Sequence, residues 1–329
     1  MLKTAWKHLS LTFNRLLSFL SGGRVIDPTL DPTLAPTLTR PWARPWTRPY
    51  VYNGNMALRR IKLLADRAQQ GVDALACALE EGLADVVTFH PEQCEDVDIA
   101  VAIGGDGTLI KHGRTLAKEE IPLVGVNNGR LGFLARFNVD SLIKNRKVVF
   151  SDAPHTLNAT LLAISVDGNP PTIAMNEAMI AAGPPFRILE LGLTINGIPA
   201  PTLRGDGIIV STPTGSTAHN VSVGGPIVDP SANAFIMTPI AAHSLAVRPI
   251  VLDGKATITV EMKQANKGTS LVIDGQVHCT MQKGMKIHVE QSQHSLSIVL
   301  NPELSYWNTL VDKLHWAAPP ELQEKQNDQ

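Results

Sequence analysis

The stretch AIGGDGTLIK, residues 102–111, decides the fold, because an apolar run ends there in three glycines around a single aspartate. Residues 97–103 predict a buried strand. Glycines lack a β-carbon and let backbone N–H groups approach an anion closely, so this turn is typical of a phosphate site. Asp106 would repel a phosphate unless it held a metal ion, accepted a proton from an attacking hydroxyl or hydrogen-bonded a sugar. An ordinary strand-to-helix turn with Asp106 as the helix N-cap is the structural alternative.

The segments around this turn alternate between helix and strand. Residues 65–81 are rich in alanine and leucine and predict a helix, residues 84–89 predict a strand, and residues 121–126 predict another apolar strand. The last of these ends in NNGRLGFL, residues 127–134. Strands that alternate with helices and end in glycines predict a Rossmann-like parallel α/β sheet, which binds its ligand at the carboxyl ends of the strands.

The pattern changes after residue 151, where short β-rich segments are separated by Gly, Pro, Asn or Asp. Helical spacing returns only over residues 304–316. Such a series predicts an antiparallel, sandwich-like all-β domain. The expected strands are residues 157–166, 172–181, 188–195, 207–211, 256–262, 270–273, 285–290 and 296–300.

We expect four parts along the chain. Residues 1–55 are a low-complexity extension, with basic amphipathic spacing at its start and prolines in a period of four over residues 27–50. This extension is interpreted as disordered, and its role as an import segment, a misassigned start or an inert extension stays open. Residues 56–150 are the α/β domain and residues 151–301 the β-rich domain. Residues 302–329 hold a C-terminal helix and a tail that return to the N-terminal domain.

Composition and charge exclude several classes of protein. With 329 residues, of which 44% are hydrophobic, the chain is long enough for two domains with buried cores. A net charge of -1 provides no basic field for nucleic acid, and no apolar stretch approaches the ~20 residues of a membrane-spanning helix. Cys77, Cys94 and Cys279 form no CxxC pair. We therefore expect a cytoplasmic protein that neither binds nucleic acid nor inserts stably into a membrane.

A second cluster of glycine and polar residues is RGDGIIVSTPTGSTAHNVSVGGP, residues 204–226. Hydroxyls and small side chains that follow an apolar strand suit a surface that hydrogen-bonds ribose and phosphate while the backbone comes close. Loops rich in serine, threonine and glycine are also common as plain turns, so this cluster alone leaves the function open.

Together these segments resemble the NAD kinase family. The long STPTGSTA segment and the Asn-Glu pair make the resemblance specific, because GGDGT turns also occur in lipid kinases and 6-phosphofructokinases. The matching segments are GGDGT at 104–108, NNGRLGFL at 127–134, Asn176-Glu177, DGIIVSTPTGSTA at 206–218, GGPI at 224–227, Arg248-Pro249, DGQ at 274–276 and SYWNTLVDKLHW at 305–316.

The resemblance implies an enzyme that phosphorylates the 2′-hydroxyl of the adenosine ribose of NAD, using ATP and Mg²⁺ or another divalent metal ion, to give NADP. It implies NAD binding in the cleft between an α/β domain and a β-rich domain, and a homodimer or homotetramer. Polyphosphate stays open as a donor. The sequence shows no dedicated metal cage, so the metal ligands are unknown and the ion is expected to arrive with ATP. A lipid kinase of the diacylglycerol or sphingosine type and a non-catalytic NAD-binding regulator are the alternatives.

The resemblance also assigns the site residues. Asp106 is the candidate general base, since a positioned carboxylate can take the proton of the attacking hydroxyl, an effect typically worth roughly 10² to 10⁴ in rate. His219 stands where the family usually has tyrosine, so a smaller, titratable ring replaces an aromatic stacking surface. The residues assigned to the nucleotide are Asp106, Gly107, Lys111, Asn176, Glu177, Arg187, Arg204, Asp206, Thr217, Ala218, His219, Asn220, Val221, Ser222 and Gln276.

Overall fold

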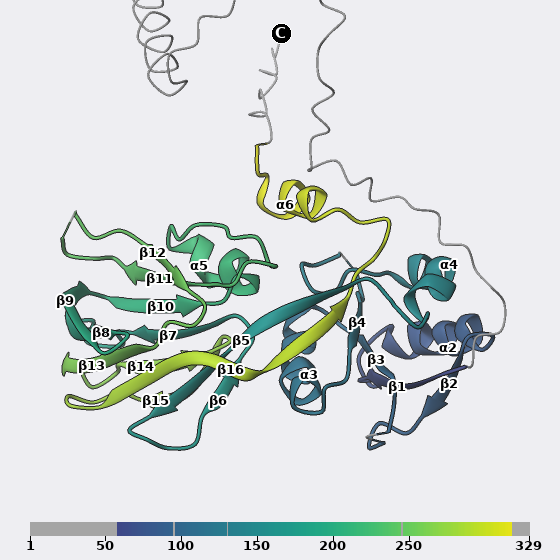
Figure 1. Cartoon of the computed structure of the whole chain (residues 1–329), viewed down its shortest axis with the longest axis horizontal. Helices are drawn as coiled ribbons and strands as arrows, with labels where there is room; N and C mark the ends of the chain where they lie inside the picture. The colour runs from purple at the N-terminus through teal and green to yellow at the C-terminus, as the bar shows by residue number, and fades with distance from the viewer. Residues whose placement is uncertain (1–57, 95, 130, 245, 318–329) are drawn as a thin grey trace, which may run out of the picture. The chain divides into compact units, whose positions relative to one another are not determined.

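The computed structural model describes residues 58–94, 96–129, 131–244 and 246–317 (Figure 1). All the elements in these ranges belong to one compact unit, Asn53–Gln329. The extension expected at residues 1–55 and the end of the expected C-terminal tail lie outside the described residues. No helix of the described part is long and apolar enough to cross a membrane.

The first half of the described chain is a parallel α/β sheet. Its four strands are parallel and lie in the order β2-β1-β3-β4, which confirms the expected parallel sheet. The elements are β1 (Arg59–Ala65), α2 (Val72–Leu83), β2 (Val87–His90), β3 (Ile99–Ile103), α3 (Asp106–Lys118), β4 (Leu123–Val126) and α4 (Val139–Val149).

Strand β3 lies at the centre of this half because all five of its residues are apolar and buried. Successive side chains of a strand point to opposite faces. Ile99, Val101 and Ile103 accordingly pack in one core with α2 and α4, whereas Ala100 and Ala102 pack in another with α3. Helices on both faces are what a parallel sheet requires, and they leave the GGDGT turn at the carboxyl end of β3.

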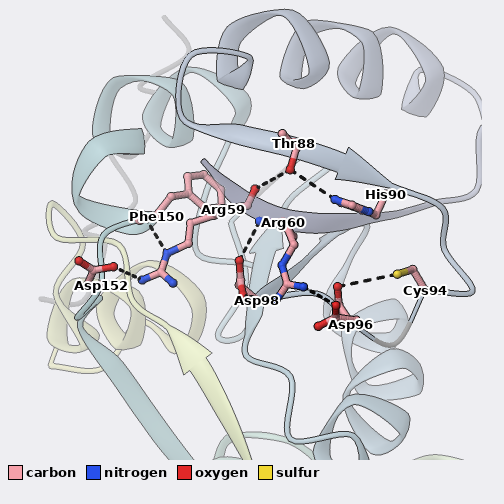
Figure 2. A network of polar contacts seen from close by, with 9 residues as sticks. All are labelled: Arg59, Arg60, Thr88, His90, Cys94, Asp96, Asp98, Phe150 and Asp152. Atoms are coloured by element: carbon pink, nitrogen blue, oxygen red, sulfur yellow. Dashed lines mark hydrogen bonds and ion pairs between the residues drawn. The ribbon is translucent and has the colours of Figure 1, made fainter. Parts of the chain in front are cut away.

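The amino end of the same sheet is held by a polar network, which Figure 2 shows around two neighbouring arginines of β1. Arg60 pairs with Asp96 and Asp98, and its backbone N–H also donates to Asp98 at 2.8 Å. Arg59 donates to the carbonyl of Phe150 and pairs with Asp152 at 2.8 Å. These contacts join β1 to the start of β3 and to the chain after α4, at the edge opposite the glycine turn.

Two long antiparallel strands connect the parallel sheet to the β-rich part (Figure 1). They are β5 (Thr156–Val166) and β16 (Lys286–Val299). Near its carboxyl end β16 pairs in parallel with β4, and near its start it pairs with β13. The separate strands expected at residues 285–290 and 296–300 are thus one strand, whose register shifts opposite β5 between Gln291 and Ser295, in a polar run.

The β-rich part is a sandwich of two sheets. One is the continuation of the first sheet through β16-β13-β8-β9, and the other has the order β12-β11-β10-β7-β14-β15. Apolar residues of both sheets share one core, as expected of a sandwich. The further elements are β6 (Thr172–Ala174), β7 (Glu177–Ala181), β8 (Leu189–Ile195), β9 (Ile198–Gly205), β10 (Gly207–Ser211), η2 (Thr214–Thr217), α5 (His219–Ser222), β11 (Ala234–Ile240), β12 (Ile250–Asp253), β13 (Ile258–Gln264), β14 (Ser270–Ile273), β15 (Gln276–Thr280) and α6 (Tyr306–Leu314).

The expected helix over residues 65–81 was wrong at its start. The helix begins at Val72, after Gly71 in a left-handed conformation with φ 81°, and Ala65 ends strand β1 instead. The strand expected at residues 172–181 is split by Met175 and Asn176 into β6 and β7. Ala65 pairs with Ile103 of β3, and β6 and β7 pair in different sheets, so both differences involve sheet pairing with distant residues.

The pattern missed α4, the short α5 and five strands, β1, β9, β11, β12 and β15, of which β9, β12 and β15 lie at sheet edges. Strand β9 contains Pro199 and Pro201, which edge strands tolerate, and β12 and β15 expose one row of backbone groups. Edge strands carry little buried apolar surface, so their sequences lack the usual alternation. The predicted domain boundary near residue 150 falls between α4 and β5 and stays a prediction.

Candidate functional site

Asp106 is the first residue of α3, but its carboxylate does not cap this helix. Gly105 occupies the N-cap position and no side chain bonds there, so the N-cap alternative is wrong. The carboxylate instead accepts three backbone N–H groups of the segment after β4: Phe133 at 3.0 Å on Oδ2, and Leu134 at 3.1 Å and Ala135 at 3.0 Å on Oδ1. The NNGRLGFL segment therefore folds around Asp106.

Glycine at position 132 makes this arrangement possible. A β-carbon on Gly132 would lie 2.1 Å from Oδ1 of Asp106, a distance no side chain tolerates. A carboxylate has about four lone-pair sites, and the three N–H groups leave one of them on Oδ2. Asp106 thus holds a loop in place and still has an acceptor site at the glycine turn.

The Asn176-Glu177 pair sits in a turn that a second carboxylate holds in the same way. Asp274, whose side chain is fully buried, accepts the N–H groups of Met175 at 2.9 Å, Asn176 at 2.7 Å and Glu177 at 3.1 Å. Arg114 of α3 places its Nε 3.0 Å from Oδ2 of the same carboxylate. Sequence reasoning chose Gln276 from the DGQ motif and missed Asp274 and Arg114; the aspartate of that motif was the available signal.

Glu177 is a buried carboxylate with an exposed histidine as its partner. Nδ1 of His219 lies 2.8 Å from Oε1, while the Glu177 side chain is 3% exposed and that of His219 is 53% exposed. Burial raises the pKa of the Glu177 carboxyl above its usual range, and the hydrogen bond from His219 opposes this rise. Oε2 has no hydrogen-bond partner among the described residues. The pair therefore leaves one buried carboxylate oxygen without a hydrogen bond from the described part of the chain.

The STPTGSTA segment packs directly on the Asn176-Glu177 turn. Thr212 donates through Oγ1 to the carbonyl of Met175 at 2.7 Å and through its backbone N–H to the carbonyl of Asn176 at 2.8 Å. A β-carbon on Gly215 would lie 2.2 Å from the carbonyl oxygen of Asn176. The glycine and the threonine are thus needed for close packing, and they bring η2 and α5 beside the turn.

The residues assigned to the loop after this segment differ in exposure. Asn220 is fully buried, and its amide bonds to Ser216, Pro226 and Thr238 within the fold. Thr217, Ala218 and Val221 are half-buried, and Ser222 is exposed. Asn220 therefore shapes this loop from inside, whereas its neighbours are accessible to a ligand.

A cavity of about 150 Å³ lies between helix α3 and the turn that joins β14 to β15. It gathers one face of α3 and the turn between β14 and β15, so the assigned residues Gly107, Lys111 and Gln276 come together there. Arg114 and Asp274 line the same cavity. The helix N-terminus and the ammonium of Lys111 suit an anion, whereas the charge of Arg114 is paired with Asp274.

Three of the assigned residues lie away from the Asn176-Glu177 turn of their own chain. Asp206 precedes β10, whose first residue pairs with Ala181 at one end of β7, whereas Glu177 pairs with Ser211 at the other end. Arg204 is exposed on β9 and pairs with Glu190, and Arg187 is exposed in the loop before β8. Among the described residues, no hydrogen bond or ion pair joins these three side chains to Asp106, Asn176 or Glu177.

No group of three or more His, Cys, Asp or Glu side chains in the described ranges is arranged to hold a metal ion. Hard cations such as Mg²⁺ prefer oxygen ligands and keep several waters. The carboxylate of Asp106 is the oxygen donor that this turn offers.

Comparison with known proteins gives a consistent result for both halves of the chain. The model for the ATP-NAD kinase N-terminal domain matches residues 53–152, and the model for the ATP-NAD kinase C-terminal domain matches residues 175–300. The NAD kinase of Geobacter sulfurreducens is 36% identical over 223 residues, which are 67% of this chain and 78% of that protein. The NAD kinase of Magnetococcus marinus is 32% identical over 267 residues, or 80% and 86% of the two chains.

Solved structures have the same fold. An NAD kinase from Archaeoglobus fulgidus in complex with ATP is 27% identical, with a TM-score of 0.60 over 74% of this chain and 94% of that chain. Yeast NADH kinase complexed with NADH is 21% identical, with a TM-score of 0.70 over 81% and 90% of the two chains. This likeness confirms the expected pairing of an α/β domain with a β-rich domain.

Proposed function

This chain belongs to the ATP-NAD kinase family and is an NAD kinase, and we propose that it transfers the γ-phosphoryl group of ATP to the 2′-hydroxyl of the adenosine ribose of NAD. The observation that carries this proposal is a continuous series of contacts between its motifs. Asp106 begins α3, Arg114 of α3 pairs with Asp274, and Asp274 binds the Asn176-Glu177 turn. The STPTGSTA segment, through Thr212, packs on the same Asn176-Glu177 turn.

Asp106 is the proposed general base. The 2′-hydroxyl oxygen attacks the γ-phosphorus, its proton passes to Oδ2 of Asp106, and the bond between the γ-phosphorus and the bridging oxygen breaks to release ADP. The three N–H groups that fix the carboxylate keep its remaining lone-pair site in one direction. Such fixed geometry reduces the entropy loss on reaching the transition state.

The donor phosphates are proposed to lie at the start of α3. Gly107 and Lys111 line the 150 Å³ cavity, and a backbone N–H group at this helix N-terminus and the lysine ammonium would neutralise negative charge as the phosphoryl group moves. A divalent ion such as Mg²⁺, entering with ATP and held mainly by phosphate and water, supplies further charge neutralisation when bound.

The adenosine part of NAD is proposed to bind beside Asn176, Glu177 and His219. The free Oε2 of Glu177 is a buried acceptor, and burying it without a partner costs about 1–3 kcal/mol. A hydroxyl or amino group of the ligand that donates to this oxygen would recover that cost. Gln276 and the residues Thr217, Ala218, Val221 and Ser222 would line the rest of the dinucleotide.

We also propose that the enzyme is a cytoplasmic homodimer or homotetramer. Arg187, Arg204 and Asp206 support an oligomer, since they resemble NAD-contacting residues but lie away from the Asn176-Glu177 turn of their own chain. In an oligomer they would reach the NAD of a second copy. Cys77, Cys94 and Cys279 are all free, which supports a reducing compartment.

The test is purified protein incubated with NAD, ATP and Mg²⁺ and coupled to an NADP-specific dehydrogenase. We expect NADP to form with ATP, and parallel reactions with polyphosphate or NADH define the donor and acceptor. Absence of NADP with every donor would overturn the proposal. A shared site is tested by mixing D106N with R204A, because an active mixture of two inactive chains requires residues from two copies.

A further inference from the structure

Asp274 lies where the two halves of the site meet, and its carboxylate is engaged mainly by the protein itself. Its side chain is fully buried, its two oxygens accept three consecutive N–H groups, and Nε of Arg114 lies 3.0 Å from Oδ2 as an ion-pair contact without a hydrogen bond. Asp274 itself has φ 46° and is followed by Gly275 with φ 78°, so a tight turn presents the carboxylate to the neighbouring segment. This arrangement is one of support rather than catalysis.

We propose that Asp274 and Arg114 form a positioning pair that sets the NAD-binding turn at Asn176-Glu177 against helix α3, which carries Asp106. The inference rests on the proposed function, because it concerns the geometry between NAD and the phosphoryl-transfer end of the same site. No contact between either residue and a reacting atom is part of it.

The geometry supports this role in two ways. Three bonds to successive N–H groups fix the backbone of the turn, and the directions of the Asn176 and Glu177 side chains follow from that backbone. Arg114 lies eight residues after Asp106 on α3, or about 12 Å along a helix that rises 1.5 Å per residue. The ion pair therefore joins the turn to the helix at a point well away from the attacking hydroxyl.

A direct packing contact reinforces the ion pair. A β-carbon on Gly113 would lie 2.5 Å from Sδ of Met175, so α3 and the turn are already as close as a glycine allows. Removal of Arg114 would leave the buried Asp274 carboxylate without its positive partner, and a buried charge that loses its partner is strongly unfavourable. The turn would then move relative to α3 or lose order.

The test compares R114M and R114K with R146M as a matched control. Arg146 likewise places Nε on an aspartate, 2.7 Å from Oδ1 of Asp85, and is about as exposed as Arg114, at 29% against 23%. It lies on α4, outside the site. NAD binding is measured by calorimetry without ATP, steady-state constants are measured for both substrates, and hydrogen exchange is followed in the peptide that contains residues 175–177.

We expect R114M to raise the dissociation constant and the KM for NAD by about tenfold to a hundredfold, the scale of an ångström-sized misplacement. The KM for ATP should stay within about twofold of wild type, and exchange at residues 175–177 should accelerate. R114K should restore most of the NAD affinity because it restores the charge, and R146M should change none of these values.

Several results would overturn the pair as a positioning device. The first is a lower Tm of R114M together with the wild-type dissociation constant for NAD, which would show that the pair serves stability alone. Another is a rise confined to the KM for ATP, which makes Arg114 a donor-contacting residue of the 150 Å³ cavity. Failure of the proposed function is separate: wild-type protein would then form no NADP, while hydrogen exchange at residues 175–177 would still report on the pair.

Discussion

At Asp106 one carboxylate serves both the fold and the proposed chemistry. Three N–H groups of the 133–135 segment bind it, so its replacement changes the loop as well as the base. At Glu177 the proposed binding role lowers stability, because a buried carboxylate with one unpartnered oxygen raises the free energy of the folded protein in the absence of ligand. Both residues show why single substitutions here need a binding or stability measurement beside the rate.

The D106N variant should lose turnover by about 10² to 10⁴, the usual contribution of a general base. An amide nitrogen cannot accept an N–H group, so the 133–135 segment should also loosen and Tm should fall by a few degrees. NAD binding, measured by calorimetry, should largely survive. More than about a tenth of wild-type turnover would exclude the base role and leave Asp106 as a positional residue.

The E177Q variant should be more stable than wild type at neutral pH. Burial raises the pKa of Glu177 in the folded state, so the ionised form destabilises the fold above that pKa and the cost disappears below the unfolded pKa. We expect a gain on the order of 1 kcal/mol, or about 2–4 °C in Tm, at pH 8. The gain should vanish toward pH 4. A stability difference that is independent of pH would contradict this reasoning.

The H219F variant should shift the pH dependence of NAD binding. His219 opposes the rise in the pKa of Glu177, so its removal should raise that pKa further, and the carboxylate should be lost at a higher pH. The acidic limb of the NAD KM profile should therefore move to higher pH in H219F and disappear in E177Q. Kinetics from pH 5.5 to 8 with saturating ATP measure this. Superimposable profiles of wild type and H219F would mean that the pair does not face NAD.

At the scale of elements, the β3-α3 connection explains why glycines recur around Asp106. Gly104 has φ 158° and lies against Thr108, where a β-carbon would come within 2.7 Å. Gly105 and Gly107 differ, since a β-carbon at either would meet nothing within 4 Å. The fold therefore requires glycine at position 104, while the open space at positions 105 and 107 is available to a ligand.

The G107A variant should separate folding from binding at this connection. Gly107 is helical, and alanine is favoured over glycine in helices by up to about 1 kcal/mol, so Tm should stay or rise slightly. The added methyl group should raise the KM for ATP several-fold by blocking the approach of phosphate. G104A, the comparison variant, should lose stability as well. An unchanged KM for ATP in G107A would place the phosphates elsewhere.

At the scale of the whole molecule, β5 and β16 belong to a ten-stranded sheet that extends through both predicted domains. Strand β16 pairs with β4 in the α/β part and with β13 in the β-rich part. Shared strands thus connect the parallel sheet to one sheet of the sandwich.

Deletion of residues 1–55 should leave Tm and turnover unchanged, because a segment with proline at every fourth position cannot build a packed core. The described elements all lie after it. Differential scanning fluorimetry and the coupled assay, run on both chains, measure the effect. A clear loss of either property in the purified truncation would show that the extension docks on the fold; altered localisation alone would not.

The sequence by itself determined the fold class, the family and the motifs, because buried strands, glycine turns and a long polar motif are local features of the chain. It placed β10 and β14 at their observed bounds and predicted a sandwich after residue 151. Edge strands such as β9, the joining of β16 and the pairing of Arg114 with Asp274 were decided by tertiary structure alone. They depend on residues far apart in sequence, such as Asp274 and Met175, whose contacts exist only once both sheets have formed.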